Sequence, residues 1–264
     1  MSNLTAEAKF FKEISKQVLD LVAGFADKPA VAKHKGRSGD YATELDVATE
    51  YLIVAEIKKR FPGDDILAEE GSSDTIIGEN RIWIIDPICG TNNVGRGIRN
   101  FCTNIALAEG KQLIASCVVD HSCKDVVWSI GNSEVYINET LHKTSSHELG
   151  VTIDVDLGCL TKTSGETKSR HSRFIKEVSL QTDFMMLSLN SSLNFLYVAI
   201  GKLAGLAQPY VHAWDMCASV FLIQQMGGIV TDIEGKSWHI ESSNVIAAQD
   251  KDVHDKLIKL YKQS

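Results

Sequence analysis

The sequence predicts two closely packed halves, an α+β half followed by an α/β half. Residues 82–130 hold short candidate strands separated by turn signals, and spacing this close is typical of an antiparallel meander. Residues 184–261 instead alternate helical and strand patterns, which is typical of layered α/β architecture. The 264 residues are 44% apolar, which is enough for a sizeable core. We therefore assign residues 1–144 to the first half and residues 145–264 to the second.

Two helices are predicted before the first strand. Five apolar residues near the N-terminus recur at the spacing of an amphipathic helix: Phe11, Ile14, Val18, Leu21 and Val22. After a loop rich in Gly, Asp and Lys at residues 33–41, Thr43 and Asp46 resemble a capping box that opens a second helix. Pro62 and Gly63 end this helix. Its predicted apolar face carries four residues: Leu45, Ala48, Leu52 and Ala55.

The remaining elements follow from short apolar runs and from changes of period. In the first half, five runs predict strands: residues 66–68, 82–85, 104–108, 113–119 and 126–130. In the second half, four runs predict strands: residues 184–189, 203–207, 228–232 and 245–248. Helical spacing covers three further segments: residues 191–200, 213–226 and 253–261.

The composition argues against several classes of protein. The net charge of −7 leaves no basic footprint for nucleic acid. No apolar run reaches the roughly 18 residues that a membrane-spanning helix needs, and the N-terminus lacks the basic and apolar regions of a signal peptide. The six cysteines form no CxxC pair, which argues against a zinc site built from neighbouring cysteines. We therefore expect a cytoplasmic protein whose cysteines, Cys89 apart, are small buried residues.

Carboxylates at two predicted strand ends are candidate metal ligands. Glu69 and Glu70 follow one strand and precede Gly71, and Asp86 ends the next strand directly before Pro87. Neighbouring strand ends can bring such side chains within reach of one hard cation such as Mg²⁺, which binds oxygen ligands and keeps water and substrate phosphate in its shell. Each motif taken alone also fits an ordinary polar turn.

Two further motifs are candidates for an anion site and for another ligand. At Gly90 and Thr91, a tight turn brings backbone amides close to an anion, and a helix that begins there adds the positive end of its dipole. Asp215 lies in the first turn of the helix predicted from residue 213. An aspartate there also stabilises the helix dipole without any other role. Each of these motifs alone therefore leaves a structural and a functional interpretation open.

Together the motifs resemble the inositol monophosphatase family of metal-dependent phosphomonoesterases. The shared order is Asp46 near a helix start, Glu69-Glu70-Gly71, Asp86-Pro87-Ile88-x-Gly90-Thr91-x-Asn93, and Trp214-Asp215 with Gly227-Gly228 downstream. The resemblance covers nearly the whole chain, from Asp46 to residues 244–248. It implies a sugar-phosphatase-like fold layered α/β/α/β/α, hydrolysis of a small polyol or sugar phosphate, and a homodimer.

The resemblance also implies roles for individual residues. Four positions would bind metal: Glu69, Asp86, the carbonyl of Ile88, and Asp215, which also lies near the leaving group. The amides of Gly90 and Thr91 would hold the substrate phosphate, and Thr91 with Asp46 would orient or deprotonate the attacking water. In such a centre, two metals roughly 4 Å apart neutralise the phosphate, activate the water and stabilise the leaving alkoxide.

The sequence departs from the family pattern on both sides of the site. Cys89 stands where the family has an aspartate that ligates the second metal. A neutral thiol removes one negative charge, and a thiolate is soft and prefers Zn²⁺ over Mg²⁺. Gln208 replaces an acidic residue that contacts inositol hydroxyls, and hydrogen bonds from a neutral amide are weaker. Further differences fall at Val94, Met186, Leu187 and residues 189–191.

Three hypotheses therefore remain open. The first is a Mg²⁺-dependent phosphatase with an impaired second metal site. The second is a family member that has lost catalysis and acts as a ligand-binding or regulatory protein. The third is a metalloenzyme that uses Cys89 as a ligand for a softer ion, such as Mn²⁺ or Zn²⁺. His212, although close to Asp215, is interpreted as structural, because the chemistry of an imidazole needs a partner that the sequence does not identify.

Overall fold

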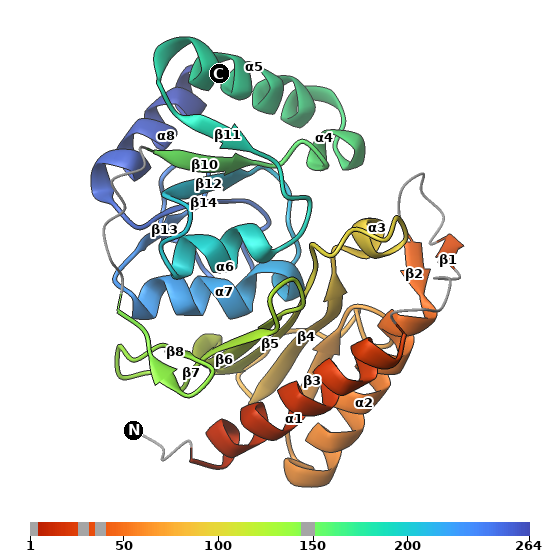
Figure 1. Cartoon of the computed structure of the whole chain (residues 1–264). Helices are drawn as coiled ribbons and strands as arrows, with labels where there is room; N and C mark the ends of the chain where they lie inside the picture. The colour runs from red at the N-terminus through yellow and green to blue at the C-terminus, as the bar shows by residue number, and fades with distance from the viewer. Residues whose placement is uncertain (1–4, 26–31, 35–40, 144–150) are drawn as a thin grey trace.

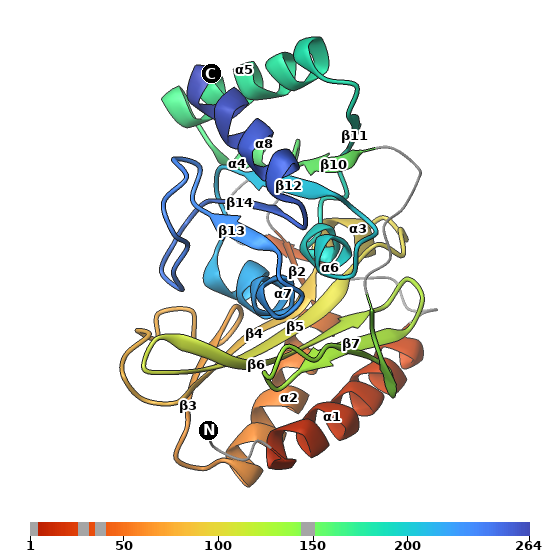
Figure 2. The ribbon, with the colours of Figure 1, turned by 90° about the vertical axis from the view of Figure 1, so that its left-hand side faces the viewer.

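The elements of the chain stack as five layers, α/β/α/β/α, as the family resemblance implied (Figure 1). The structure, a computed structural model, describes residues 5–25, 32–34, 41–143 and 151–264. Six helices form the three helical layers: α1 (Thr5–Gly24), α2 (Glu44–Arg60), α5 (Gly165–Gln181), α6 (Leu193–Ala199), α7 (Ala213–Gln225) and α8 (Lys251–Gln263). The pairs α1–α2 and α5–α8 cover the outer faces of the two sheets, and α6 and α7 lie between the sheets (Figures 1 and 2).

A seven-stranded sheet forms the second layer, in the order β3-β4-β5-β6-β7-β8-β9. Its strands are β3 (Asp65–Ala68), β4 (Ile82–Cys89), β5 (Cys102–Glu109), β6 (Gln112–Asp120), β7 (Asp125–Ser129), β8 (Tyr136–Ile137) and β9 (Thr140–Leu141). Strand β3 is parallel to β4 and the later pairs are antiparallel, which confirms the predicted meander. Because helices cover both faces, β4 is apolar on both: Trp83 and Ile85 pack towards α1 and α2, and Ile82 and Ile84 towards α6 and α7.

A five-stranded sheet forms the fourth layer, in the order β11-β10-β12-β14-β13. Its strands are β10 (Thr152–Val155), β11 (Met185–Leu187), β12 (Gly205–Gln208), β13 (Ile229–Thr231) and β14 (Val245–Ala248). Strand β10 is parallel to both of its neighbours, whereas β14 is antiparallel to both of its own. The parallel pair β10–β11 is joined by a helical crossover, which is the connection that parallel strands require.

Strand β4 is longer than the sequence predicted. It does not end at Asp86 but continues through Pro87 to Cys89, with a shift of register against β5 between Asp86 and Cys89. Proline cannot donate a hydrogen bond to a sheet and is tolerated at such bulges. The irregularity re-aims the end of the strand, so that Asp86 and Cys89 both line the same cleft.

Two predictions near α2 were wrong. Part of the segment at residues 33–41 is not loop, since strands β1 (Ala32–His34) and β2 (Tyr41–Thr43) pair there; residues 35–40 lie outside the described part. The predicted apolar face of α2 was wrong in part, because Ala55 is exposed although Leu45 is buried and Leu52 packs against the core. The buried face instead includes polar residues, which apolar periodicity cannot detect: Leu45, Asp46, Thr49, Glu50, Ile53 and Ile57.

The sequence also missed β10 and two helices, α4 (Cys159–Lys162) and α5. Helix α5 buries only His171, Phe174 and Val178, so it carries a weak apolar signal. The predicted boundary between the halves falls at residues 144–150, outside the described residues, and stays a prediction. Within the described residues, no helix is long and apolar enough to cross a membrane. All six cysteines are free thiols, and all except Cys123 are buried.

Candidate active site

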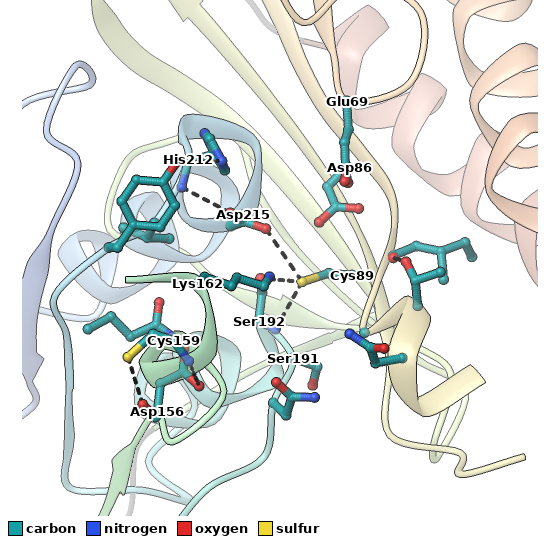
Figure 3. Close-up of a pocket in the computed structure, with 18 residues that line it drawn as sticks. Glu69, Asp86, Cys89, Asp156, Cys159, Lys162, Ser191, Ser192, His212 and Asp215 are labelled. Atoms are coloured by element: carbon teal, nitrogen blue, oxygen red, sulfur yellow. Dashed lines mark hydrogen bonds between the residues drawn. The ribbon is translucent and has the colours of Figure 1, made fainter. Parts of the chain in front are cut away.

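The predicted site residues surround one cleft where the two halves of the chain meet (Figure 3). One wall is formed by the end of β4 and the turn into helix α3 (Thr91–Val94). The other wall is formed by the N-terminal end of α7, the end of β12 and helix α4. The cleft is open to solvent on one side and is lined mostly by polar groups.

A hydrogen-bonded pair, Asp46 and Thr91, joins α2 to the turn after β4. Asp46 completes the capping box predicted from the sequence: its Oδ2 accepts the Thr43 backbone N–H at 2.9 Å and also the Thr43 hydroxyl. Its Oδ1 accepts the Thr91 hydroxyl at 2.8 Å. The same Thr91 oxygen lies 3.1 Å from the carbonyl of Ile88. Burial raises the pKa of Asp46 although these hydrogen bonds oppose the rise.

The turn after β4 requires glycine at position 90. Gly90 has a φ of +108°, which residues with a Cβ rarely adopt. A Cβ there would lie 2.9 Å from the carbonyl oxygen of Asn100 and 3.0 Å from the Cβ of Ser191. Asn93 holds the same region, since its Nδ2 donates to the carbonyls of Asn100 at 2.7 Å and Leu189 at 3.2 Å. At this turn, the backbone of the first half therefore lies directly against residues of the second half.

Three donor atoms meet at the centre of the cleft. One carboxylate oxygen each from Asp86 and Asp215 and the sulfur of Cys89 lie within 4.8 Å of one another. We call these three residues the acid cluster. Asp86 is fully buried, and neither of its carboxylate oxygens has a hydrogen-bond partner among the described residues. An unpaired buried carboxylate is unfavourable in its ionised form unless a cation binds it, so the acid cluster fits a divalent cation.

The pKa values of the acid cluster also fit a bound cation. Burial, with the nearby Cys89, Glu69 and Asp215, raises the pKa of Asp86 well above its usual range. Burial and Glu69 also raise the pKa of Asp215. A hydrogen bond with the Cys102 thiol, together with burial, raises the pKa of Cys89. Crowded acids of this kind ionise together only when a cation offsets their charge.

Glu69 is presented by the turn after β3. Its N–H donates to the carbonyl of Ile85 at 3.2 Å, and the next N–H, of Glu70, donates to Glu50 Oε2 at 2.8 Å. Glu50 is buried on α2. A Cβ on Gly71 would lie only 2.8 Å from Glu50 Oε1. Glu50 therefore holds the turn that carries Glu69, and sequence reasoning missed it because buried glutamates are rare and carry no pattern.

The second half supplies the rest of the cleft. Gln208 is 7% exposed and lines the cleft from the end of β12. The ring of His212 stacks on Trp214 with centroids 4.5 Å apart, and its backbone N–H donates to Asp215 Oδ2 at 2.9 Å, which agrees with a structural interpretation. Lys162 of α4 also lines the cleft, and its charge partly offsets the effect of burial on the pKa of Asp215. Sequence reasoning missed Lys162.

The structure brings all the predicted site residues together. Those that line the cleft are Glu69, Asp86, Ile88, Cys89, Gly90, Thr91, Gln208 and Asp215. Asp46 reaches it through its hydrogen bond to Thr91. Of the positions that differ from the family pattern, Asn190 and Ser191 also line the cleft, together with Ser192, which the sequence did not indicate.

Comparison with known proteins agrees with this geometry. The chain matches the model of the inositol monophosphatase family over residues 3–264. It is 28% identical over 221 residues to a fructose-1,6-bisphosphatase/inositol-1-monophosphatase from Thermotoga maritima, covering 84% of this chain and 82% of that protein. It is also 28% identical over 203 residues to the Nus factor SuhB from Xylella fastidiosa, covering 74% of this chain and 70% of that protein. The solved structure of a Thermotoga maritima IMPase matches with a TM-score of 0.83 at 27% identity, covering 98% of both chains.

Proposed function

Because the chain belongs to the inositol monophosphatase family, we propose that it is a divalent-metal-dependent phosphomonoesterase that hydrolyses a small polyol or sugar phosphate. One observation carries the proposal: Thr91, which donates a hydrogen bond to Asp46, lines the same cleft as the acid cluster. Phosphate monoester hydrolysis needs a cation to neutralise the dianion and a group to take a proton from water. This cleft offers candidates for both.

The donor set on the β3–β4 side fits Mg²⁺. Glu69 follows β3, Asp86 lies within the adjacent parallel strand β4, and the carbonyl of Ile88 adds a third oxygen to the same wall. Mg²⁺ is held by a few protein oxygens and completes its shell with water and phosphate. The two carboxylate oxygens of Asp86, which lack hydrogen-bond partners in the described part of the chain, support this assignment. A metal bound there would neutralise phosphate charge and lower the pKa of its water.

Asp46 and Thr91 are proposed to act on the attacking water. The Thr91 hydroxyl donates its proton to Asp46 Oδ1, so the threonine oxygen is oriented to accept a proton from water in the cleft. The raised pKa of Asp46 makes its carboxylate a better final proton acceptor. The amides of Gly90 and Thr91 are proposed to hold the phosphate, and Asp215 to serve the leaving-group side across the acid cluster.

The other wall of the cleft suggests the substrate class. Gln208 offers an amide that can hydrogen-bond a sugar or polyol hydroxyl. Lys162 adds a positive charge that favours an anionic substrate in an otherwise acidic cleft. The name of the Thermotoga relative combines the two substrates of this class, inositol 1-phosphate and fructose 1,6-bisphosphate.

A ligand-binding or regulatory role without hydrolysis is the second candidate. Cys89 favours it, because a neutral thiol leaves the leaving-group side of the acid cluster with fewer charges to hold a metal. The Xylella relative is named a Nus factor, so a regulatory role has a parallel among similar proteins. A homodimer, a cytoplasmic location and the absence of a nucleic-acid partner also remain predictions, the last supported by the net charge of −7.

Phosphate release separates the two candidates. The substrates are inositol 1-phosphate, fructose 1,6-bisphosphate and a nucleotide 3′-phosphate, each with Mg²⁺, Mn²⁺ or Zn²⁺. We expect release from at least one, and a loss of about 100-fold or more in Asp46→Asn, which removes the proton acceptor. Asp252→Asn, exposed on α8 and far from the cleft, is the matched control. Equal release by wild type and Asp46→Asn, or none with any metal, would refute the phosphatase proposal.

A further inference from the structure

The acid cluster differs in chemistry from its neighbouring oxygen ligands. Asp86 and Cys89 come from the end of β4, and Asp215 from the first turn of α7, so rigid elements of both halves hold the three donor atoms within 4.8 Å of one another. Figure 3 shows the three side chains pointing towards a common centre. Only one of the three donors is a sulfur atom, and that atom decides which cations fit.

Asp86, which also supports the proposed Mg²⁺ site, supplies a second sign of a bound cation at the acid cluster. It is fully buried, it points into the acid cluster, and both of its carboxylate oxygens lack hydrogen-bond partners in the part of the chain that the structure describes. Buried carboxylates in proteins are normally paired or bind metal. The ionised form of this carboxylate therefore requires a positive partner at this point.

The sulfur of Cys89 is held in place from the other half. The Ser192 backbone N–H donates to Cys89 Sγ at 3.1 Å, and the Ser192 hydroxyl lies 2.7 Å from the same sulfur. Asp215 Oδ1 lies 3.8 Å away. Hydrogen bonds onto a ligand atom orient it and stabilise its charged form when a metal binds. Ser192 is 3% exposed, so these contacts are shielded from water.

We infer that Asp86, Cys89 and Asp215 form a binding site for a thiophilic divalent cation of the Zn²⁺ class rather than a second Mg²⁺. Two carboxylates and one thiolate, with an open position towards the cleft, are a donor set that Zn²⁺ accepts and Mg²⁺ disfavours. On binding, the Cys89 thiol loses its proton to solvent and the sulfur becomes a metal ligand. The inference rests on the proposed function only for the location of the site, because it concerns binding without substrate.

Metal binding by the whole protein tests the inference. By titration calorimetry, we expect wild type to bind Zn²⁺ at least about 100-fold more tightly than Cys89→Ser, since the thiolate is the distinguishing ligand. Cys89→Asp should reverse the preference by gaining Mg²⁺ affinity. Ser192→Ala should weaken Zn²⁺ binding by about tenfold, as outer partners of ligands do. Cd²⁺ serves as a spectroscopic probe, because a cadmium–thiolate bond gives an ultraviolet charge-transfer band.

Cys159→Ser is the matched control, because Cys159 lines the same cleft but its thiol donates to the Asp156 carbonyl at 2.8 Å. It should keep the cadmium band that Cys89→Ser loses. X-ray absorption at the zinc edge of the wild type needs no variant and should show one sulfur at about 2.3 Å. A zinc shell of oxygen and nitrogen only, or unchanged Zn²⁺ affinity in Cys89→Ser, overturns the inference. Zinc bound through Cys89 without phosphate release would instead overturn only the phosphatase proposal.

Discussion

His121 should make the protein sensitive to mild acid. Its ring is 8% exposed and stacks on Phe101, with centroids 4.8 Å apart, and Nε2 lies 3.0 Å from Thr103 Oγ1. Because the Thr103 hydroxyl donates to the Pro87 carbonyl at 2.7 Å, it accepts the proton of Nε2, and the Nδ1 atom is left buried without a partner among the described residues. Burial lowers the pKa of His121 to about 4. The neutral ring thus supports the backbone of the Asp86–Pro87 motif.

The magnitude follows from linkage between protonation and folding. The unfolded chain protonates this imidazole near its ordinary pKa of 6.5, whereas the folded protein resists until about pH 4. The stability provided by the neutral ring is therefore complete above pH 6.5 and is lost as the pH falls towards 4. Integration between about pH 7.5 and about pH 5 gives a loss of about 2 kcal/mol in the free energy of unfolding.

Urea unfolding of wild type and His121→Gln at these two pH values measures this loss. The glutamine amide can still donate to Thr103 but does not titrate, so the variant should lose about 2 kcal/mol less on acidification. Burial raises the pKa of Asp154 to about 6, so protonation of this residue increases the free energy of unfolding as the pH falls. Because Asp154 is present in both proteins, its contribution cancels in the comparison. His239→Gln, at an exposed position, is the control and should behave as wild type. Equal losses in wild type and His121→Gln would refute the reasoning.

Three further substitutions test the scaffold of the cleft. Gly90→Ala should lower the free energy of unfolding, measured in urea, by about 2–4 kcal/mol because it introduces backbone strain and overpacking. The control is Gly95→Ala, where an added Cβ meets no atom nearer than 3.5 Å, and it should change this free energy by less than about 1 kcal/mol. Glu50→Gln should weaken Mg²⁺ binding by about tenfold in calorimetry, because the turn that carries Glu69 loses a charge-assisted acceptor; unchanged affinity would remove its positioning role. Asn93→Ala should cost about 2 kcal/mol in thermal unfolding, since it removes the Nδ2 donor that the Asn100 carbonyl accepts at 2.7 Å and one of the two amide donors to the Leu189 carbonyl.

Local patterns account for the parts of the fold that the sequence predicted. The meander from β4 to β7 has tight turns and buried strands, so its signals lie within a few residues of one another. The passage of β4 through Pro87 could not be predicted, because proline normally marks a strand end and the bulge exists only through pairing with β5. Helix α5 was missed because its few buried residues pack only when α8 lies beside it.

The site was predictable where ligands are neighbours in sequence and not where packing creates the contact. Glu69, Asp86 and Thr91 belong to short motifs with a recognisable order. Ser192 contacts Cys89 across 103 positions of the chain, and no local pattern records that meeting. Glu50 reaches the turn of Glu69 from α2 in the same way. Supporting residues of a site are therefore the part that needed the structure.

Cys89 has a different meaning in the structure than in the sequence. In the sequence it is a missing carboxylate, which argues for lost catalysis. In the structure its sulfur has two contacts with Ser192 and lies beside Asp86, whose carboxylate oxygens have no hydrogen-bond partner among the described residues. A site that had merely decayed would not need the sulfur held in this orientation, and the charge of Asp86 would remain uncompensated. Since Asp86 and Asp215 come from different halves of the chain, a cation between them would hold the halves together whether or not a phosphate is hydrolysed. We therefore expect the acid cluster to bind a cation in the folded protein even when no substrate is present.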